Sequence, residues 1–276
     1  MEARGTTDAV REPRDGRRAR RPLGGNRQEW LLCPRPDPEA SLRLLCLPYA
    51  GGRAGGLLGL ADGLPAGVEM GVVELPGHGG RLREVPFTRL RPLVAHLAGR
   101  LAGRLDKPYV LLGYSMGALL AFEVAHELAR RGLPGPRALF VAAFEAPHLP
   151  PARPPMHDLP RAGLLARLAR YDNAAAAVLG NEELAGIMLP IVRADMAVCE
   201  TYEHRPRPPL DVPVAAFGGD ADATVSRDGL EAWRELTRGG FSVTHVPGGH
   251  FFLDSARDVF VKGLRAELAR LTDSRE

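Results

Sequence analysis

The stretch Gly113-Tyr114-Ser115-Met116-Gly117 decides how the rest of this chain is interpreted. It follows an apolar run at residues 109–112 (YVLL) and precedes a helical pattern that starts at residue 118 (ALLAFE). A G-x-S-x-G pattern between a strand and a helix predicts a nucleophile elbow, a tight turn that holds the serine above the end of a sheet. We therefore expect Ser115 to be a nucleophile. The alternative is an ordinary glycine-rich turn, in a chain with 32 glycines.

The regions on both sides of this motif alternate between two patterns. Short apolar runs typical of buried strands lie at residues 41–47, 68–75, 138–143, 212–217 and 241–246, in addition to 109–112. Helical periodicity follows at residues 88–105, 116–131 and 255–271. This alternation predicts an α/β fold with a mostly parallel, doubly wound sheet covered by helices on both faces.

Residues 147–210 interrupt the alternation. They contain two proline-rich stretches and helical patterns around 164–168 and 183–202, but no convincing strand. More than sixty residues are longer than one crossover helix needs, so we expect a helical lid over one end of the sheet. The alternative is a crossover that merely packs on one face. Apolar residues of this segment that could line a substrate chamber, or equally form plain core, are Leu164, Leu168, Leu179, Ile187, Met188, Ile191 and Met196.

The composition excludes several classes of protein. The three cysteines are odd in number and form no CxxC pair, which argues against a disulfide scaffold and a cysteine-based metal site. No apolar run reaches the roughly 18 residues of a membrane-spanning helix. We therefore expect a soluble, cytoplasmic protein with no metal or other cofactor.

The charge of the chain lies at its amino end. Residues 1–30 hold eight arginines and five acidic residues, which accounts for the whole net charge of +3. We expect residues 1–28 to be a disordered, arginine-rich extension, with a docking element as the alternative. Residues 29–276 then form a single domain with almost no net charge, which does not favour a nucleic-acid partner.

A nucleophilic serine needs a base, and His250 has the position of one. It follows the strand candidate at residues 241–246, on a turn that begins Pro247-Gly248-Gly249. The order expected for this type of site is Ser, then Asp or Glu, then His. The other seven histidines lie within strand or helix patterns, precede the acid, or lie in residues 147–210. His250 is thus the predicted general base.

The acid should follow the strand candidate at residues 212–217. Asp220 and Asp222 both occur there, in the sequence GGDADATV at residues 218–225. We expect Asp222 to be the acid because it lies deeper in the loop and fits a G-x-x-D-x-x-V arrangement. Asp220 remains the alternative, since it could also cap the turn.

Two backbone amides could stabilise negative charge on a substrate oxygen. One is the N–H of Met116, directly after the nucleophile, and the other should come from the loop after an early strand. The loop at residues 47–52 (LPYAGG) fits, and we expect the N–H of Ala50 to be the second donor. Alternatively, Gly51 and Gly52 simply form a tight turn.

Taken together, these motifs resemble the type II thioesterases of polyketide and nonribosomal peptide assembly lines, within the α/β-hydrolase superfamily. The resemblance runs through most of residues 29–270. Besides the elbow, it is carried by residues 47–52 (LPYAGG), 74–77 (ELPG), 146–150 (APHLP), 157–160 (HDLP), 193–195 (RAD), 200–202 (ETY), 219–222 (GDAD) and 248–251 (GGHF). The segments within 147–210 are what distinguish this family from other hydrolases.

The chain departs from the family pattern in three places. Tyr114 stands where the family most often has histidine, a change we expect to be harmless. In the family, an arginine and an acidic residue often follow Pro76-Gly77, whereas this chain has HGGR at residues 78–81. The resemblance therefore does not predict the structure of this loop. The arginine-rich extension before residue 28 is not part of the pattern.

The resemblance implies a reaction and a partner. Ser115, His250 and Asp222 would hydrolyse acyl thioesters on the phosphopantetheine arm of an acyl or peptidyl carrier protein in trans, removing aberrant acyl groups, with no nucleic-acid or membrane partner. The alternatives are a general carboxylesterase, a peptidase or an acyl-CoA thioesterase on the same fold, a cyclising chain-release thioesterase, and a noncatalytic carrier-binding protein.

Overall fold

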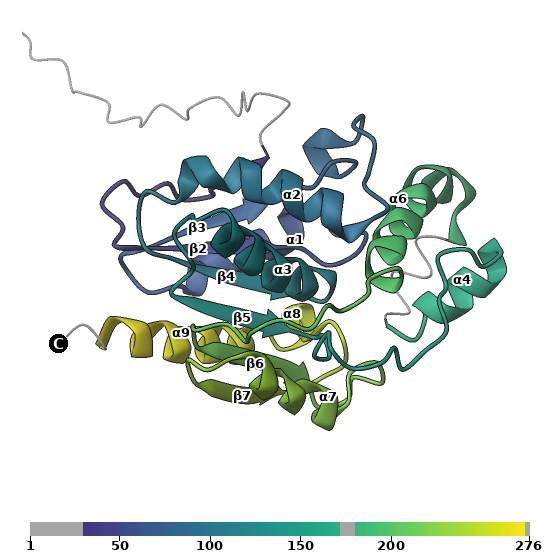
Figure 1. Ribbon diagram of the computed structural model, residues 1–276. Coiled ribbons are helices and arrows are strands. Elements are labelled where there is room, and N and C mark those ends of the chain that lie inside the picture. The colour runs from purple at the N-terminus through teal and green to yellow at the C-terminus, as the bar shows by residue number, and fades with distance from the viewer. Residues whose placement is uncertain (1–29, 172–179, 274–276) are drawn as a thin grey trace, which may run out of the picture.

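Seven strands form one sheet in the computed structural model, which describes residues 30–171 and 180–273 (Figure 1). The strands are β1 (Leu31–Leu32), β2 (Leu42–Leu47), β3 (Val68–Val73), β4 (Tyr109–Tyr114), β5 (Ala138–Ala142), β6 (Val214–Gly219) and β7 (Phe241–Val246). They are ordered β1-β3-β2-β4-β5-β6-β7, and among these described strands only β1 is antiparallel to its neighbour. The predicted α/β fold with a mostly parallel sheet is confirmed.

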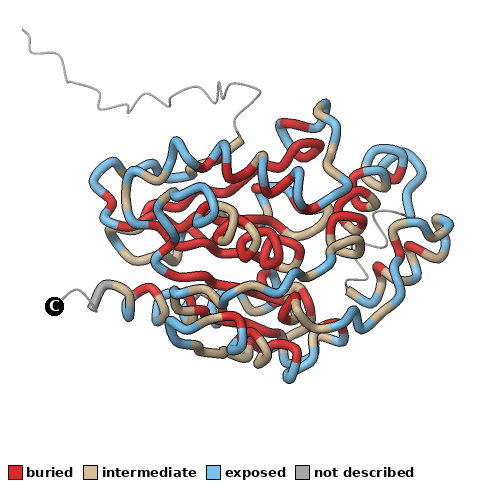
Figure 2. The backbone as a smooth tube through the Cα atoms, viewed as in Figure 1, coloured by how far each residue is buried: buried red, intermediate tan, exposed pale blue. Residues whose placement is uncertain are grey.

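Helices cover both faces of the sheet. One face is covered by α2 (Leu90–Leu101), α3 (Met116–Arg130) and α7 (Arg227–Glu231), and the other by α1 (Gly55–Leu58), α8 (Phe252–Ser255) and α9 (Arg257–Asp273). Short 3₁₀ turns at Gly59–Gly63, Gly79–Arg81, Ala102–Arg104 and Ala232–Leu236 complete these connections. Figure 2 shows the central strands buried, whereas exposed residues lie on the outer sides of the helices and in the connecting loops. The edge strand β7 is mostly half-buried.

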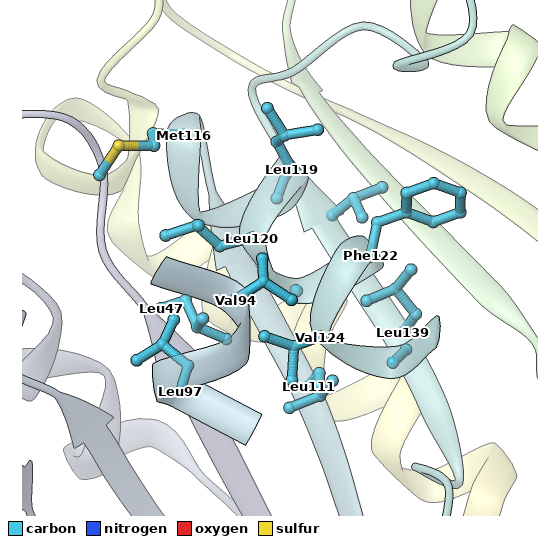
Figure 3. Close-up of a cluster of buried hydrophobic side chains, with 14 of the residues drawn as sticks. Leu47, Val94, Leu97, Leu111, Met116, Leu119, Leu120, Phe122, Val124 and Leu139 are labelled. Atoms are coloured by element: carbon cyan, nitrogen blue, oxygen red, sulfur yellow. The ribbon is translucent and has the colours of Figure 1, made fainter. Parts of the chain in front are cut away.

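Each strand supplies side chains to two separate cores because successive residues point to opposite faces. In β2, Leu45 and Leu47 enter the core under α2 and α3, whereas Leu44 and Cys46 enter the core under α9. Figure 3 shows the first core, where residues of three neighbouring strands meet those of the two helices: Leu47, Leu111 and Leu139 with Val94, Leu97, Leu120 and Val124. Burial on both faces explains why these strands read as continuous apolar runs.

The predicted elements agree with the structure apart from local shifts. The strand expected at 212–217 begins at Val214, because Pro213 has no N–H to donate to the ladder. The strand expected at 109–112 continues to Tyr114 and so reaches the elbow. The helix expected at 255–271 is α9, which begins two residues later at Arg257, and the short helix α8 precedes it. The two-residue strand β1 was not predicted, since it is too short to show a periodic pattern.

The segment between β5 and β6 contains α4 (Arg161–Leu168) and α6 (Glu182–Glu200), which lie together at one end of the sheet (Figure 1). A small core of Met156, Leu164, Leu168 and Val192 joins the two helices. We call residues 147–210 the inserted segment; its role as a lid remains a prediction. The predicted extension at residues 1–28 and Leu179 lie outside the described residues. Across the described ranges, no helix has the length and apolar character needed to cross a membrane.

Candidate active site

Ser115 occupies a turn that only its two neighbouring glycines allow. Its φ of 52° and ψ of −118° place it outside both the strand and the helix that it joins. A Cβ on Gly113 would lie 2.0 Å from the carbonyl oxygen of Gly117, and a Cβ on Gly117 would lie 2.1 Å from that of Leu47. The backbone N–H of Ser115 donates to the carbonyl of Ala142 at 2.7 Å. The positive φ is a strained conformation that this packing holds in place.

The structure brings Ser115, His250 and Asp222 into one chain of hydrogen bonds. The distance from His250 Nε2 to Ser115 Oγ is 2.9 Å, and that from His250 Nδ1 to Asp222 Oδ2 is 2.8 Å. The His250 and Asp222 side chains are 4% and 1% exposed. With Nδ1 donating its proton to the carboxylate, Nε2 is the free acceptor for the serine hydroxyl. This is the arrangement that general-base activation of a serine requires.

Asp222, and not Asp220, contacts His250. The Asp220 carboxylate accepts from Arg227 at 2.8 Å and is 45% exposed. Burial alone would raise the pKa of Asp222, but hydrogen bonds from His250 and Thr224 and the charge on His250 outweigh it and hold that pKa below its ordinary value. An ionised Asp222 can stabilise a protonated His250.

Thr224 binds Asp222 and was not among the site residues predicted from the sequence. Its hydroxyl and its backbone N–H both donate to Asp222 Oδ1, at 2.6 and 2.7 Å. The hydroxyl oxygen also lies 3.0 Å from His250 Nδ1. A threonine two residues after an aspartate suits an Asx turn, which is the signal that could have pointed to it.

Tyr114 lies beneath His250 and contacts its main chain. The Tyr114 hydroxyl donates to the carbonyl of His250 at 2.6 Å and accepts from the N–H of Leu253 at 3.3 Å. Burial raises the pKa of Tyr114, so the phenol keeps its proton. Tyr114 therefore supports the turn that carries His250. We had expected tyrosine in place of histidine at position 114 to be a harmless change, and that expectation did not include this contact.

The loop at residues 47–52 lies against the elbow, where Gly117 packs on the carbonyls of Leu47 and Pro48. Ala50 and Met116 line the same cavity as Ser115. As the first residue of α3, Met116 has an N–H with no partner within the helix. The structure thus places both residues beside the serine, and the role of their N–H groups as donors stays a prediction.

The two glycines after Ala50 form a turn and also receive a contact from the inserted segment. The N–H of Gly52 donates to the carbonyl of Tyr49 at 2.9 Å, which closes the turn. The N–H of Gly51 donates to Asp195 Oδ2 of α6 at 2.7 Å. The orientation of this loop therefore depends on α6.

His78 lies in the loop after Pro76-Gly77, for which the family resemblance made no prediction. Its Nε2 lies 2.8 Å from Asp195 Oδ2 and its Nδ1 lies 3.1 Å from the carbonyl of Pro76. Both partners are acceptors, so two hydrogen bonds require a doubly protonated, cationic ring. Burial alone would lower the pKa of His78, but the bonds to Asp195 and Pro76 and the charges of Asp195 and Glu74 outweigh it, and the pKa lies above its ordinary value.

Two cavities meet at Ser115 and His250. One has a volume of 260 Å³ and is lined by apolar side chains of α4 and α6. The other has a volume of 210 Å³, and its wall combines apolar side chains with three arginines of the inserted segment. Of the residues expected to line a chamber, Leu168, Met188 and Met196 line the first cavity. Leu164 and Ile191 are buried without lining either of these two cavities, and Ile187 is 51% exposed.

Comparisons with known proteins agree with this geometry. Residues 42–268 match the family model described as "Thioesterase domain". The chain is 36% identical over 245 residues to the gramicidin S biosynthesis protein GrsT of Aneurinibacillus migulanus, covering 87% of this chain and 96% of that protein.

Solved structures give the same result. The RedJ thioesterase of the prodiginine pathway of Streptomyces coelicolor is 42% identical with a TM-score of 0.78, over 85% of this chain and 91% of that one. The type II thioesterase BorB from the borrelidin biosynthetic cluster is 36% identical with a TM-score of 0.78, over 86% and 96%.

Proposed function

The chain belongs to the thioesterase family and is a hydrolase of thioesters, and we propose that it acts as a type II enzyme that removes acyl groups from the phosphopantetheine arms of carrier proteins. The observation that carries the proposal is the chain of hydrogen bonds from Asp222 through His250 to Ser115 at the elbow. A serine held in this way can attack an acyl carbon and form an acyl-enzyme.

In the first half of the proposed reaction, Ser115 Oγ attacks the thioester carbonyl and His250 Nε2 takes its proton. The backbone N–H groups of Met116 and Ala50 donate to the oxygen that becomes negative. Such donors stabilise charge that develops only in the transition state, and each is worth about 10²–10³ in rate. The resulting imidazolium is stabilised by the Asp222 carboxylate and then protonates the departing thiolate.

In the second half, water replaces the thiol. His250 takes a proton from this water, which attacks the acyl carbon of the ester on Ser115. When the tetrahedral intermediate collapses, His250 returns the proton to Ser115 Oγ. The products are the free acid and the regenerated enzyme, so one histidine serves as base and acid in both halves.

The proposed partner is an acyl or peptidyl carrier protein that meets this enzyme in trans, and the proposed role is to remove aberrant acyl groups. The relatives support this, since RedJ is named for a prodiginine pathway and BorB for the borrelidin cluster. We keep the expected cytoplasmic location, which suits the reduced thiols of Cys46 and Cys199.

A time course of carrier-bound acyl chains, followed by intact mass, tests the proposal. We expect acyl loss from the carrier with a higher kcat/KM than for the matching acyl-CoA or p-nitrophenyl ester. Ser115→Ala should lower kcat by up to about 10⁶-fold while leaving carrier binding intact. Equal or better turnover of the simple ester would favour a general carboxylesterase, and an active Ser115→Ala variant would rule out the nucleophile.

A further inference from the structure

The two cavities that meet at Ser115 are both largely apolar, but only one of them has arginine side chains on its wall. Resting on the proposed function, we propose that the apolar cavity holds the acyl chain and that the arginine-lined cavity holds the phosphopantetheine arm, with Arg167 and Arg170 binding its phosphate. This division determines the direction in which the substrate lies across Ser115.

The apolar cavity suits an acyl chain. Leu168 of α4 and Met188, Val192 and Met196 of α6 line it, beside Ser115 and His250. Among the described residues on its wall, His250 is the only ionisable side chain apart from the hydroxyls of Tyr49 and Tyr171. Removing a methylene group from water contributes about 0.8 kcal/mol, so such a wall favours the apolar half of the substrate and disfavours a phosphate.

The second cavity contains three cations whose charges are not neutralised by carboxylates. The Arg153 guanidinium donates to the carbonyls of Ala223 and Thr224, at 2.5 and 2.9 Å, and Arg167 donates to the carbonyl of Pro154 at 2.5 Å. Arg170 has no side-chain partner among residues 30–171 and 180–273. All three keep their full charge because a carbonyl partner is neutral.

The two carboxylates on the wall of this cavity are already occupied. Glu145 accepts from the N–H and the hydroxyl of Ser226, at 2.9 and 2.7 Å. Glu200 accepts from the backbone N–H groups of Met156 and His157, both at 2.9 Å, and from the His157 ring. Neither contacts an arginine of the cavity, and the three guanidinium groups outnumber the two carboxylates, so this wall attracts an anion.

The anionic part of the substrate lies at one end only. On one side of the thioester is the acyl chain; on the other is an arm with two amides that ends in a phosphodiester. A guanidinium binds phosphate through paired, charge-assisted hydrogen bonds. Tyr171 lines both cavities, with its ring centroid 4.9 Å from that of His250, and so marks the boundary where the thioester would lie.

The test compares two small substrates that differ only in the phosphate, an acyl-pantetheine and the matching acyl-4′-phosphopantetheine. We expect the wild type to prefer the phosphorylated thioester in kcat/KM by roughly tenfold, as one charge-assisted bond provides. Arg170→Gln should reduce this preference to less than about threefold, and Arg167→Gln should reduce it in the same direction. Arg153 is unsuitable for this test because it holds the carbonyls next to Asp222.

Two control variants separate the cavities. Arg265→Gln removes an equal charge from the exposed side of α9 and should leave the phosphate preference unchanged. Met188→Trp fills the apolar cavity and should lower the ratio of octanoyl to acetyl turnover, with the phosphate preference kept. Arg170→Gln should lower the phosphate preference and leave the ratio of octanoyl to acetyl turnover unchanged.

Three results would overturn the division: no phosphate preference in the wild type, the same preference in Arg170→Gln, or a loss in Arg170→Gln that occurs only with the intact carrier. The third would assign these arginines to the surface of the carrier protein. Failure of the proposed function is a separate result, in which the acyl-carrier is not cleaved although the small thioesters show the expected phosphate preference.

Discussion

The Asp195 carboxylate of α6 accepts a hydrogen bond from the backbone N–H of Gly51, with 2.7 Å between the two atoms. These residues are 144 positions apart, and the bond ties the inserted segment to the loop that carries Ala50. The contact is reinforced by packing, since a Cβ on Gly51 would lie 2.9 Å from Val192 Cγ2. The position of α6 therefore sets the orientation of the amide that we propose as an oxyanion donor.

Asp195→Ala should lower kcat by about tenfold. The substitution leaves the Gly51 N–H without its acceptor, so the neighbouring Ala50 amide loses its fixed direction. Removing an oxyanion donor outright costs about 10²–10³ in rate, and a displaced donor should cost less. The measurement is kcat on an N-acetylcysteamine thioester. Asp158→Ala, a 92% exposed acid in the same segment, is the control and should retain wild-type turnover.

The bond between His78 and Asp195 should make stability depend on pH. The pKa of His78 is raised above 6.5 in the folded state, so the folded state holds the proton more tightly. Its contribution is complete below pH 6.5 and is lost as the pH rises through the raised value. The free energy of unfolding of the wild type relative to His78→Gln should therefore be greatest at pH 6 and decrease towards pH 9.

Urea unfolding at a series of pH values measures this difference. His78→Arg, with a charge that does not titrate in this range, should remove the pH dependence while retaining the bond to Asp195. The carboxylates that face His78 are those of Asp195 and Glu74. A stabilising contribution of His78 that grows as the pH rises would contradict the cationic ring.

Asp222→Asn should lower kcat by about 10⁴-fold, because an amide favours the wrong tautomer of His250. Asp220→Asn is the matched control: Asp220 pairs with Arg227 at the surface, and its loss should change kcat by less than about threefold. Steady-state turnover of one thioester by both variants decides between the two acids. A larger loss in Asp220→Asn would reverse the assignment.

Tyr114→Phe should destabilise the protein by about 1–3 kcal/mol, since the buried His250 carbonyl and Leu253 N–H lose their partner. Tyr109→Phe provides the control, because the Tyr109 hydroxyl makes an equivalent bond of 2.6 Å to the carbonyl of Pro134, far from Ser115. Both variants should unfold at lower urea concentration, but only Tyr114→Phe should also lower kcat. Equal turnover in the two would reduce Tyr114 to a purely structural role.

The sequence alone predicted the strands and helices that repeat a clear pattern, and it singled out Ser115, Asp222 and His250 by their order and their places after strands. The structure places these three side chains within hydrogen-bonding distance. It also explains the shift of β6, since a proline cannot join the ladder. The individual strands, helices and motifs could be predicted because each of them depends on residues that are close together along the chain.

The contacts of Tyr114 and Asp195, the contact of Thr224 with His250, and the two cavities that meet at Ser115 could not be derived in this way. Periodicity and turn residues are local properties, whereas a hydrogen bond forms only when two atoms lie about 3 Å apart. Gly51 and Asp195 reach that distance only after the sheet has formed and α6 has packed against its end. The sequence thus determined which groups are present, and the tertiary structure alone decided which of them meet, because close packing fixes distances that chain position leaves free.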